Sequence, residues 1–153
     1  MKSQKGFTLV ELMVTLAIIG ILFATAVPVY HTWQQRAYGS EAAITTKQIL
    51  DAQVLFFLEK DKFYPIDGKS ITIFHETSPD NTDLKDISEK LNIRIPTGHF
   101  LEYYFLTDNT TGAEEFAVTV RSRNDQFDIF KGFKTLTGKV DKTGKIDYVG
   151  LPD

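Results

Sequence analysis

A long apolar run near the start of the chain is followed by a segment that alternates between apolar and polar residues at helical spacing. The run from Phe7 to Tyr30 is 24 residues long, and Glu11 is its only charged residue. As an α-helix it would rise about 36 Å at 1.5 Å per residue, which is enough to cross the hydrocarbon core of a bilayer. The pattern therefore predicts a helix that is buried in lipid or in a bundle of other helices.

The segment from Arg36 to Lys60 is predicted to continue this helix in amphipathic form. The apolar residues expected on one face are Ala43, Leu50, Val54, Phe57 and Leu58, and those expected opposite are Glu41, Gln48 and Glu59. Pro65 disfavours a helical conformation at the residue before it, so the helix should end near Asp61–Tyr64. One long helix would thus have apolar surroundings in its first half and lie against a globular domain in its second half.

Two residues interrupt the apolar run. Gly20 weakens a helix by about 1 kcal/mol relative to alanine. Pro28 removes one backbone hydrogen bond and usually kinks a helix. We therefore expect a local weakness between these two positions.

The remainder of the chain is predicted to form mainly strands. Residues 71–74 fit a short strand and residues 83–91 a short helix. Further strands are expected at 100–107, 116–121 and 126–133, and Val140 and residues 146–148 flank a turn at 141–144. The predicted fold class is α+β, with an antiparallel sheet of about four strands packed on the amphipathic half of the first helix.

Glu11 is chemically out of place in an apolar run. A carboxylate at the centre of a membrane helix costs about 2.5–3.5 kcal/mol on insertion scales, and such a group marks a functional site by default. If the chain is cut after Gly6, Phe7 gains a free cationic amino group. Glu11 of one copy could then pair with the new amino terminus of a neighbouring copy.

The stretch from Lys5 to Leu12, preceded by a short basic leader, resembles the prepilin signature of type IV pilins and of the pseudopilins of type II secretion. The matching features are Gly6 before the cut, Phe7 after it, and Glu11 at the fifth position of the mature chain. Pro28 also lies where pilins commonly have a proline. The resemblance covers roughly the first 65 residues, and beyond them it rests on the predicted architecture.

This resemblance implies three regions: a leader at 1–6, a hydrophobic transmembrane or filament-core helix at 7–31, and a globular pilin domain at 32–153. It implies cleavage after Gly6 and N-methylation of Phe7 by a prepilin peptidase. It also implies a single span of the inner membrane with a cytoplasmic amino terminus, and an inner-membrane assembly platform as partner. Copies would then assemble into a helical filament, an extracellular pilus or a periplasmic pseudopilus, with Glu11, Gly20 and Pro28 as assembly residues.

Several alternatives stay open at this stage. Within the same family, the chain would be a major pilin, a minor pilin or a pseudopilin. An ordinary secretory signal peptide would instead be cut after Ala26. A membrane-anchored binding domain that never polymerises would tolerate the substitution Glu11→Leu.

Composition narrows the function further. The chain has no cysteine, so its fold must be held by packing without a disulfide. The net charge of −3 falls by two to −5 if Lys2 and Lys5 leave with the leader, and this acidity does not favour nucleic acid as a main partner.

No catalytic or cofactor site is predicted. The three histidines, His31, His75 and His99, are isolated, and no nucleophile or phosphate-loop motif accompanies them. Asp141 and Asp147 flank a glycine turn and are candidates for a calcium loop. A plain hairpin turn explains these two residues better, because the loop lacks the dense alternating acids of a calcium site.

Overall fold

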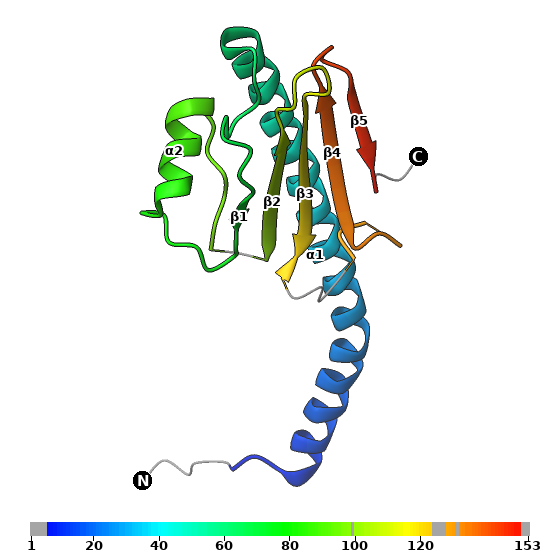
Figure 1. Cartoon of the computed structure of the whole chain (residues 1–153). Coiled ribbons are helices and arrows are strands. Elements are labelled where there is room, and N and C mark those ends of the chain that lie inside the picture. Colours follow the sequence, from blue (N-terminus) through cyan, green and yellow to red (C-terminus); the bar gives the residue numbers. More distant parts are fainter. Residues whose placement is uncertain (1–5, 99, 124–127, 131, 151–153) are drawn as a thin grey trace. The chain divides into compact units, whose positions relative to one another are not determined.

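The computed structural model describes residues 6–98, 100–123, 128–130 and 132–150. Two helices and five strands follow one another along the chain (Figure 1). They are α1 (Leu9–Lys60), β1 (Ile71–Ile73), α2 (Thr82–Leu91), β2 (Leu101–Asp108), β3 (Glu115–Ser122), β4 (Thr135–Asp141) and β5 (Ile146–Val149). This is the predicted α+β layout, with five strands in place of about four. The chain divides into two compact units, Met1–Gln34 and Gln35–Asp153, which are described separately below.

Helix α1 is one element of 52 residues, and neither Gly20 nor Pro28 ends it. Proline lacks the N–H that would bond the carbonyl one turn earlier, so one backbone bond is missing within the helix. The helix ends as predicted: Asp61 follows it with a positive φ of 56°, and its N–H donates to the carbonyl of Phe57 at 2.7 Å. A left-handed residue at this position is a common helix terminator.

The N-terminal unit exposes its apolar side chains. Every residue of α1 from Leu9 to Tyr30 is exposed. The large hydrophobic side chains among them are Leu9, Val10, Leu12, Met13, Val14, Leu16, Ile18, Ile19, Ile21, Leu22, Phe23, Val27, Val29 and Tyr30. By length and composition, α1 is the one helix in the described part of the chain that is able to cross a membrane.

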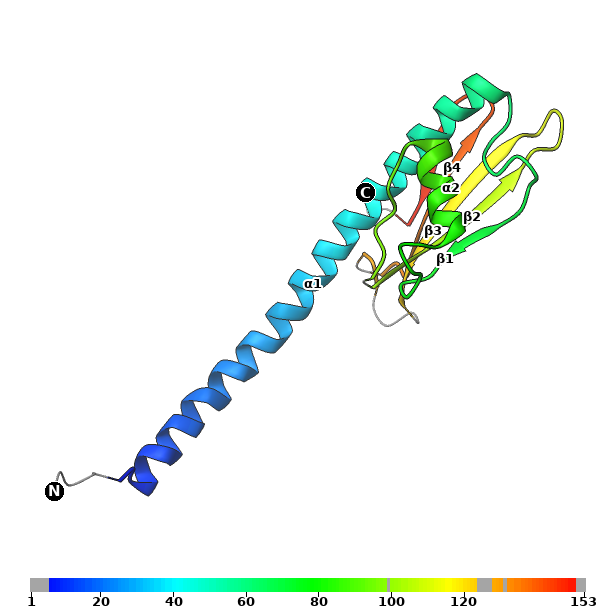
Figure 2. The same cartoon turned by 90° about the vertical axis from the view of Figure 1, so that its left-hand side faces the viewer.

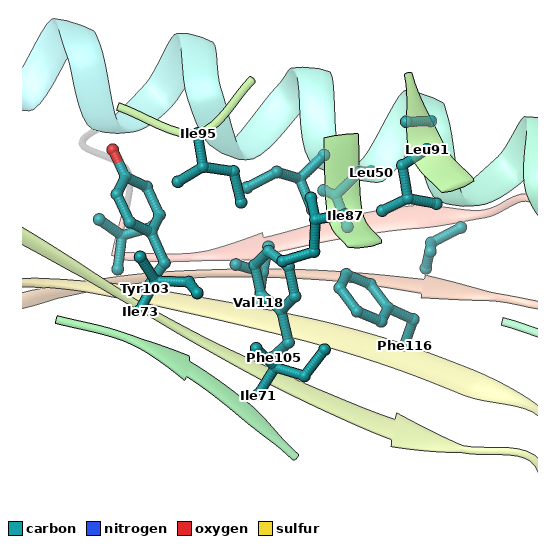
Figure 3. Close-up of a cluster of buried hydrophobic side chains, with 14 of the residues drawn as sticks. Leu50, Ile71, Ile73, Ile87, Leu91, Ile95, Tyr103, Phe105, Phe116 and Val118 are labelled. Carbon is teal, nitrogen blue, oxygen red and sulfur yellow. The ribbon is translucent and has the colours of Figure 1, made fainter. Parts of the chain in front are cut away.

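The C-terminal unit is a single antiparallel sheet in the order β1-β2-β3-β4-β5, in which every strand pairs with its neighbours in the sequence. Helix α2 and the second half of α1 lie on the same face of this sheet (Figure 2). Side chains from both helices and from β1, β2 and β3 meet there in one apolar core, which includes Leu50, Ile87, Phe105, Phe116 and Val118 (Figure 3).

The amphipathic half of α1 largely follows the predicted pattern. Its buried residues are Gly39, Ala42, Thr45, Thr46, Ile49, Leu50, Ala52, Gln53 and Phe56. Ala43, Val54 and Phe57 are partly buried against the core. The expectation for Leu58 was wrong, because its side chain is 77% exposed at the end of the helix.

The prediction of a strand at 126–133 is also wrong for those of its residues that the structure describes. Residues 124–127 and 131 lie outside the described part, and residues 128–133 otherwise contain only an isolated bridge between Phe130 and Phe133. The two residues exchange backbone hydrogen bonds of 3.2 and 2.8 Å around Gly132, which has a φ of 86°. The next strand is β4, of which the sequence pattern indicated only Val140.

Two side-chain amides fix the segment that leaves α1. Gln53, fully buried, donates to the carbonyl of Tyr64 at 2.7 Å and accepts from the Tyr64 N–H at 2.9 Å. Asn109, after β2, accepts from the Phe63 N–H at 2.9 Å and donates to the Phe63 carbonyl at 3.0 Å. These bonds satisfy backbone groups of the segment that follows the helix, and the Tyr64 carbonyl also accepts from the Thr107 hydroxyl at 3.2 Å.

Candidate functional site

The predicted assembly site lies at the start of α1, where Thr8 and Glu11 bond to each other in both directions. The Thr8 hydroxyl accepts from the Glu11 N–H at 3.2 Å. Glu11 Oε2 accepts from the Thr8 N–H at 2.9 Å and from the Thr8 hydroxyl at 2.8 Å. This is a capping box, which supplies partners for donors at a helix start that have none within the helix.

The same box restrains the Glu11 side chain. Both of its hydrogen bonds use Oε2. No described residue bonds to the other oxygen, Oε1. The carboxylate is therefore held at the beginning of the helix with one acceptor atom still unused.

The predicted cleavage point lies just before the helix. Gly6, Phe7 and Thr8 have no regular secondary structure, and Phe7 is 75% exposed. An added Cβ at Gly6 would meet no atom within 4 Å. The bond between Gly6 and Phe7 is thus accessible in the described part of the chain, and the prediction that it is cut remains a prediction.

The threonine hydroxyls of the apolar run bond to backbone carbonyls within the helix. The Thr15 hydroxyl donates to the carbonyl of Leu12 at 2.8 Å, and the Thr25 hydroxyl donates to that of Leu22 at 3.0 Å. Around Gly20 an added Cβ would find open space.

Pro28 lies inside α1, and its carbonyl accepts from the Thr32 hydroxyl at 3.1 Å. This bond belongs to the turn that follows the proline. Roles for Gly20 and Pro28 in assembly remain predictions.

Asp141 and Asp147 do not come together as metal ligands. Asp141 Oδ1 accepts from the Thr143 N–H at 2.8 Å, the Thr143 hydroxyl at 2.6 Å and the Lys145 N–H at 3.1 Å, as in a turn. Asp147 pairs with the Lys145 ammonium at 2.8 Å. Within the described ranges, no group of three or more histidine, cysteine or acidic side chains is placed to hold a metal ion.

Strand β2 carries a buried acid that no pattern in the sequence predicted. The side chain of Glu102 is only 4% exposed and bonds to three donors: His75 Nδ1 at 3.0 Å, the Tyr104 hydroxyl at 2.9 Å and Arg121 Nε at 3.1 Å. Arg121 also lies over the Tyr104 ring, 4.5 Å from its centroid. We refer to these four residues as the Glu102 cluster.

Two opposing effects act on this carboxyl. Burial favours the neutral form, but the hydrogen bonds from His75, Tyr104 and Arg121 outweigh it, so the pKa of Glu102 lies below its ordinary value of 4.5. The Glu102 cluster ties the exit of β1 to β2 and β3. Its members are far apart in the sequence, whereas the capping box had a local signal, because Thr-x-x-Glu before an apolar run is its sequence signature.

Comparisons with known proteins agree with the predicted signature. Residues 1–27 match the family described as the Prokaryotic N-terminal methylation motif. The type IV major pilin protein PilA of Myxococcus xanthus is 49% identical over 60 residues, which are 39% of this chain and 27% of that protein. PilE of Neisseria gonorrhoeae, also a type IV major pilin protein, is 36% identical over 84 residues, 55% of this chain and 50% of PilE.

A fimbrial protein of Moraxella nonliquefaciens is 60% identical over 42 residues, which are 28% of this chain and 27% of that protein. The chain thus spans between about a quarter and half of the length of these curated relatives. No solved structure matches it significantly. These findings confirm the resemblance to the type IV pilin family that the prepilin signature indicated.

Proposed function

We propose that this chain, which carries the signature of the type IV pilin family at its N-terminus, is a structural subunit of a type IV pilus. The observation that supports this most strongly is the first half of α1. It is apolar and exposed on all sides, and it bears a carboxylate near its start. Such a surface requires either lipid or other helices around it. A structural subunit would have no catalytic activity of its own.

The proposed pathway has two environments for this helix. Before assembly the helix spans the inner membrane, with its amino terminus in the cytoplasm. A prepilin peptidase then cuts after Gly6 and methylates Phe7. Transfer into a filament replaces lipid by neighbouring helices, and because lipid is as apolar as the side chains, packing and polar pairing must drive this step.

Glu11 supplies the polar pairing in this proposal. Its carboxylate would accept the cationic amino group of Phe7 from an adjacent copy, so that both charges are compensated in the filament core. Each copy would then offer a donor at one point and an acceptor at another. A head-to-tail contact of this kind that does not close into a ring produces an open helical filament.

A pseudopilin of type II secretion or a minor pilin would use the same chemistry and remains the alternative within the family. Before assembly, the partners would be the membrane, the prepilin peptidase and an assembly platform in the inner membrane. After assembly, the partners would be other copies of the chain, in an extracellular pilus or a periplasmic pseudopilus.

Intact mass and N-terminal sequencing of the mature protein from its native host test the proposal. A chain that begins at N-methylated Phe7 is expected. A chain that begins after Ala26 would refute it. Electron microscopy of the wild type and of Glu11→Leu completes the test, because a non-polymerising anchored domain would tolerate this substitution and a filament subunit would not.

A further inference from the structure

Two exposed cations and an exposed aromatic side chain gather at one end of the sheet in the C-terminal unit. Arg123 directly follows β3, Lys134 directly precedes β4, and Phe133 beside it is 41% exposed. The end of β3 and the start of β4 lie together, because Thr135 pairs with Arg121. We refer to Arg123, Phe133 and Lys134 as the basal patch.

The basal patch lies at the end of this unit where its part of α1 begins (Figure 1). Gln35, the first residue of the unit, donates through Nε2 to the carbonyl of Asp128 at 2.7 Å. The Tyr38 ring stacks edge-on against Phe100, with centroids 5.2 Å apart. The Phe100 carbonyl in turn accepts from the Arg123 N–H at 2.6 Å. These contacts fix the patch to the first turns of the amphipathic helix.

The apolar run places this end of the unit close to a membrane surface. Its last residue, Tyr30, precedes Gln35 by five residues, which rise about 7–8 Å in an α-helix. That length is about the depth of one headgroup layer of a bilayer. We propose that the basal patch docks the C-terminal unit on anionic lipid headgroups before assembly. This rests on the proposed function, because it requires the first half of α1 to span a membrane.

Charge is arranged differently at the two ends of the sheet. In the turn between β4 and β5, at the opposite end, Lys142 and Lys145 pair with carboxylates at 3.6 and 2.8 Å. Arg123 and Lys134 are exposed and form no ion pair with a described residue, and the nearby Asp128 is half-buried. Exposed cations beside an aromatic side chain fit the interface of a membrane that contains anionic lipid.

The expected strength of docking follows from the two charges. Each Lys or Arg near an anionic surface favours binding about fivefold, so Arg123 and Lys134 together give about 25-fold. Salt should weaken the attraction, because the Debye length falls to about 3 Å at 1 M. An attachment of this strength orients the unit on the membrane and is still reversible when a copy leaves for the filament.

Fluorescence quenching in vesicles tests the docking with the full chain. Trp33→Phe removes the only tryptophan of the chain, and Phe133→Trp then places a probe in the patch. Lipids brominated near the headgroup should quench this probe in vesicles of phosphatidylcholine with phosphatidylglycerol. Quenching should fall in pure phosphatidylcholine and at 1 M salt. Leu58→Trp is the matched probe at the far end of α1, where the side chain is 77% exposed, and it should not be quenched.

Charge variants of the probe protein identify the cations responsible. Arg123→Gln combined with Lys134→Gln should weaken docking about 25-fold, read from quenching at several phosphatidylglycerol contents. Lys142→Gln combined with Lys145→Gln removes the same charge at the opposite end and should leave docking unchanged. Quenching at position 133 that is independent of phosphatidylglycerol, or equal effects of the two double variants, would overturn the inference.

Two further measurements separate this inference from the proposed function. Alkaline extraction of the vesicles reports on the membrane span alone, and a chain that is extracted would refute the membrane step of the proposed function. Filament counts in the native host test the other role open to the cations. Loss of filaments in Arg123→Gln with Lys134→Gln, while docking on lipid is unchanged, would assign the patch to a contact between copies and overturn lipid docking.

Discussion

Replacing Glu102 by glutamine should destabilise the C-terminal unit without changing its shape. The substitution turns one carboxylate oxygen into an NH₂ group, although three donors surround this side chain. A hydrogen bond to a charged group contributes about 1.5–3 kcal/mol. Arg121 is partly exposed and regains water, which reduces the loss. We therefore expect the free energy of unfolding to fall by about 2–3 kcal/mol.

A loss of this size is a large share of the roughly 5–15 kcal/mol that stabilises a typical domain. Circular dichroism of the full chain in detergent should record it as a drop in Tm of about 10 °C. Glu76→Gln is the control, since Glu76 lies one residue after His75 and is exposed. A Glu102→Gln shift no larger than that of Glu76→Gln would refute the assigned role of the cluster.

The same pair of proteins has a defined pH dependence. The pKa of Glu102 is lowered in the folded chain, so its contribution to stability is complete above its unfolded value of about 4.5. The contribution is lost as pH falls through the folded pKa. The difference in unfolding free energy between wild type and Glu102→Gln should therefore shrink below about pH 4.5. A difference that stays constant to lower pH would contradict this reasoning.

Three further predictions concern single residues of the C-terminal unit. Gly39→Ala should lower its free energy of unfolding by about 1 kcal/mol or more, measured with urea. A Cβ at this position would lie 2.6 Å from the Ile129 carbonyl oxygen, and this clash exceeds the gain in helix propensity. Equal or higher stability would refute the close approach. Gln53→Leu should cost about 1–3 kcal/mol in the same assay, because the Tyr64 N–H loses its partner and the Tyr64 carbonyl keeps only the bond from the Thr107 hydroxyl at 3.2 Å. A neutral effect would contradict this role of Gln53. Burial and the bond to Glu102 raise the pKa of Tyr104 to about 12. Ultraviolet absorbance should therefore show this tyrosine ionising well above pH 10 in the folded chain. The neutral Tyr104 side chain contributes fully to folding stability below pH 10, and this contribution is lost as pH rises toward 12. In Glu102→Gln the Tyr104 titration should move to lower pH.

Local signals in the sequence predicted much of the fold. The apolar run and the spacing at 36–60 gave helix α1, and Pro65 predicted its end. The alternation at 116–121 predicted β3, whose residues Phe116, Val118 and Val120 are indeed buried. Each of these features depends on neighbours within a few positions of the chain.

Features that depend on tertiary contacts were missed. Strand β4 contains Gly138, and glycine within a sequence usually disfavours a strand. An added Cβ at this position would lie 2.7 Å from the Leu50 Cδ1 and Thr46 Cγ2 atoms of α1. The glycine is therefore needed where the helix approaches the sheet. The alternation around Ile129 indicated a strand, but the Phe130–Phe133 bridge turns the chain instead.

The candidate site shows the same division. Thr8 and Glu11 are three residues apart, so their box is readable from the sequence once the helix start is known. The residues of the Glu102 cluster come from the segment after β1 and from strands β2 and β3. The sequence around Glu102 does not indicate which of these distant side chains it contacts. What Oε1 of Glu11 pairs with cannot be read from one chain, because the proposed partner belongs to another copy.

The order of strands in the sheet has a consequence for folding during synthesis. Each strand pairs only with its sequence neighbours, so the sheet is rich in local contacts, and such topologies fold fast. The loops at 109–114 and 142–145 are short, whereas the connection from β1 to β2 is longer and contains α2. The amphipathic half of α1 is made first, however, and its buried face has no cover until the strands that follow emerge. Until those strands are made, that exposed apolar face can aggregate. Fast pairing of neighbouring strands shortens the time for which it is uncovered.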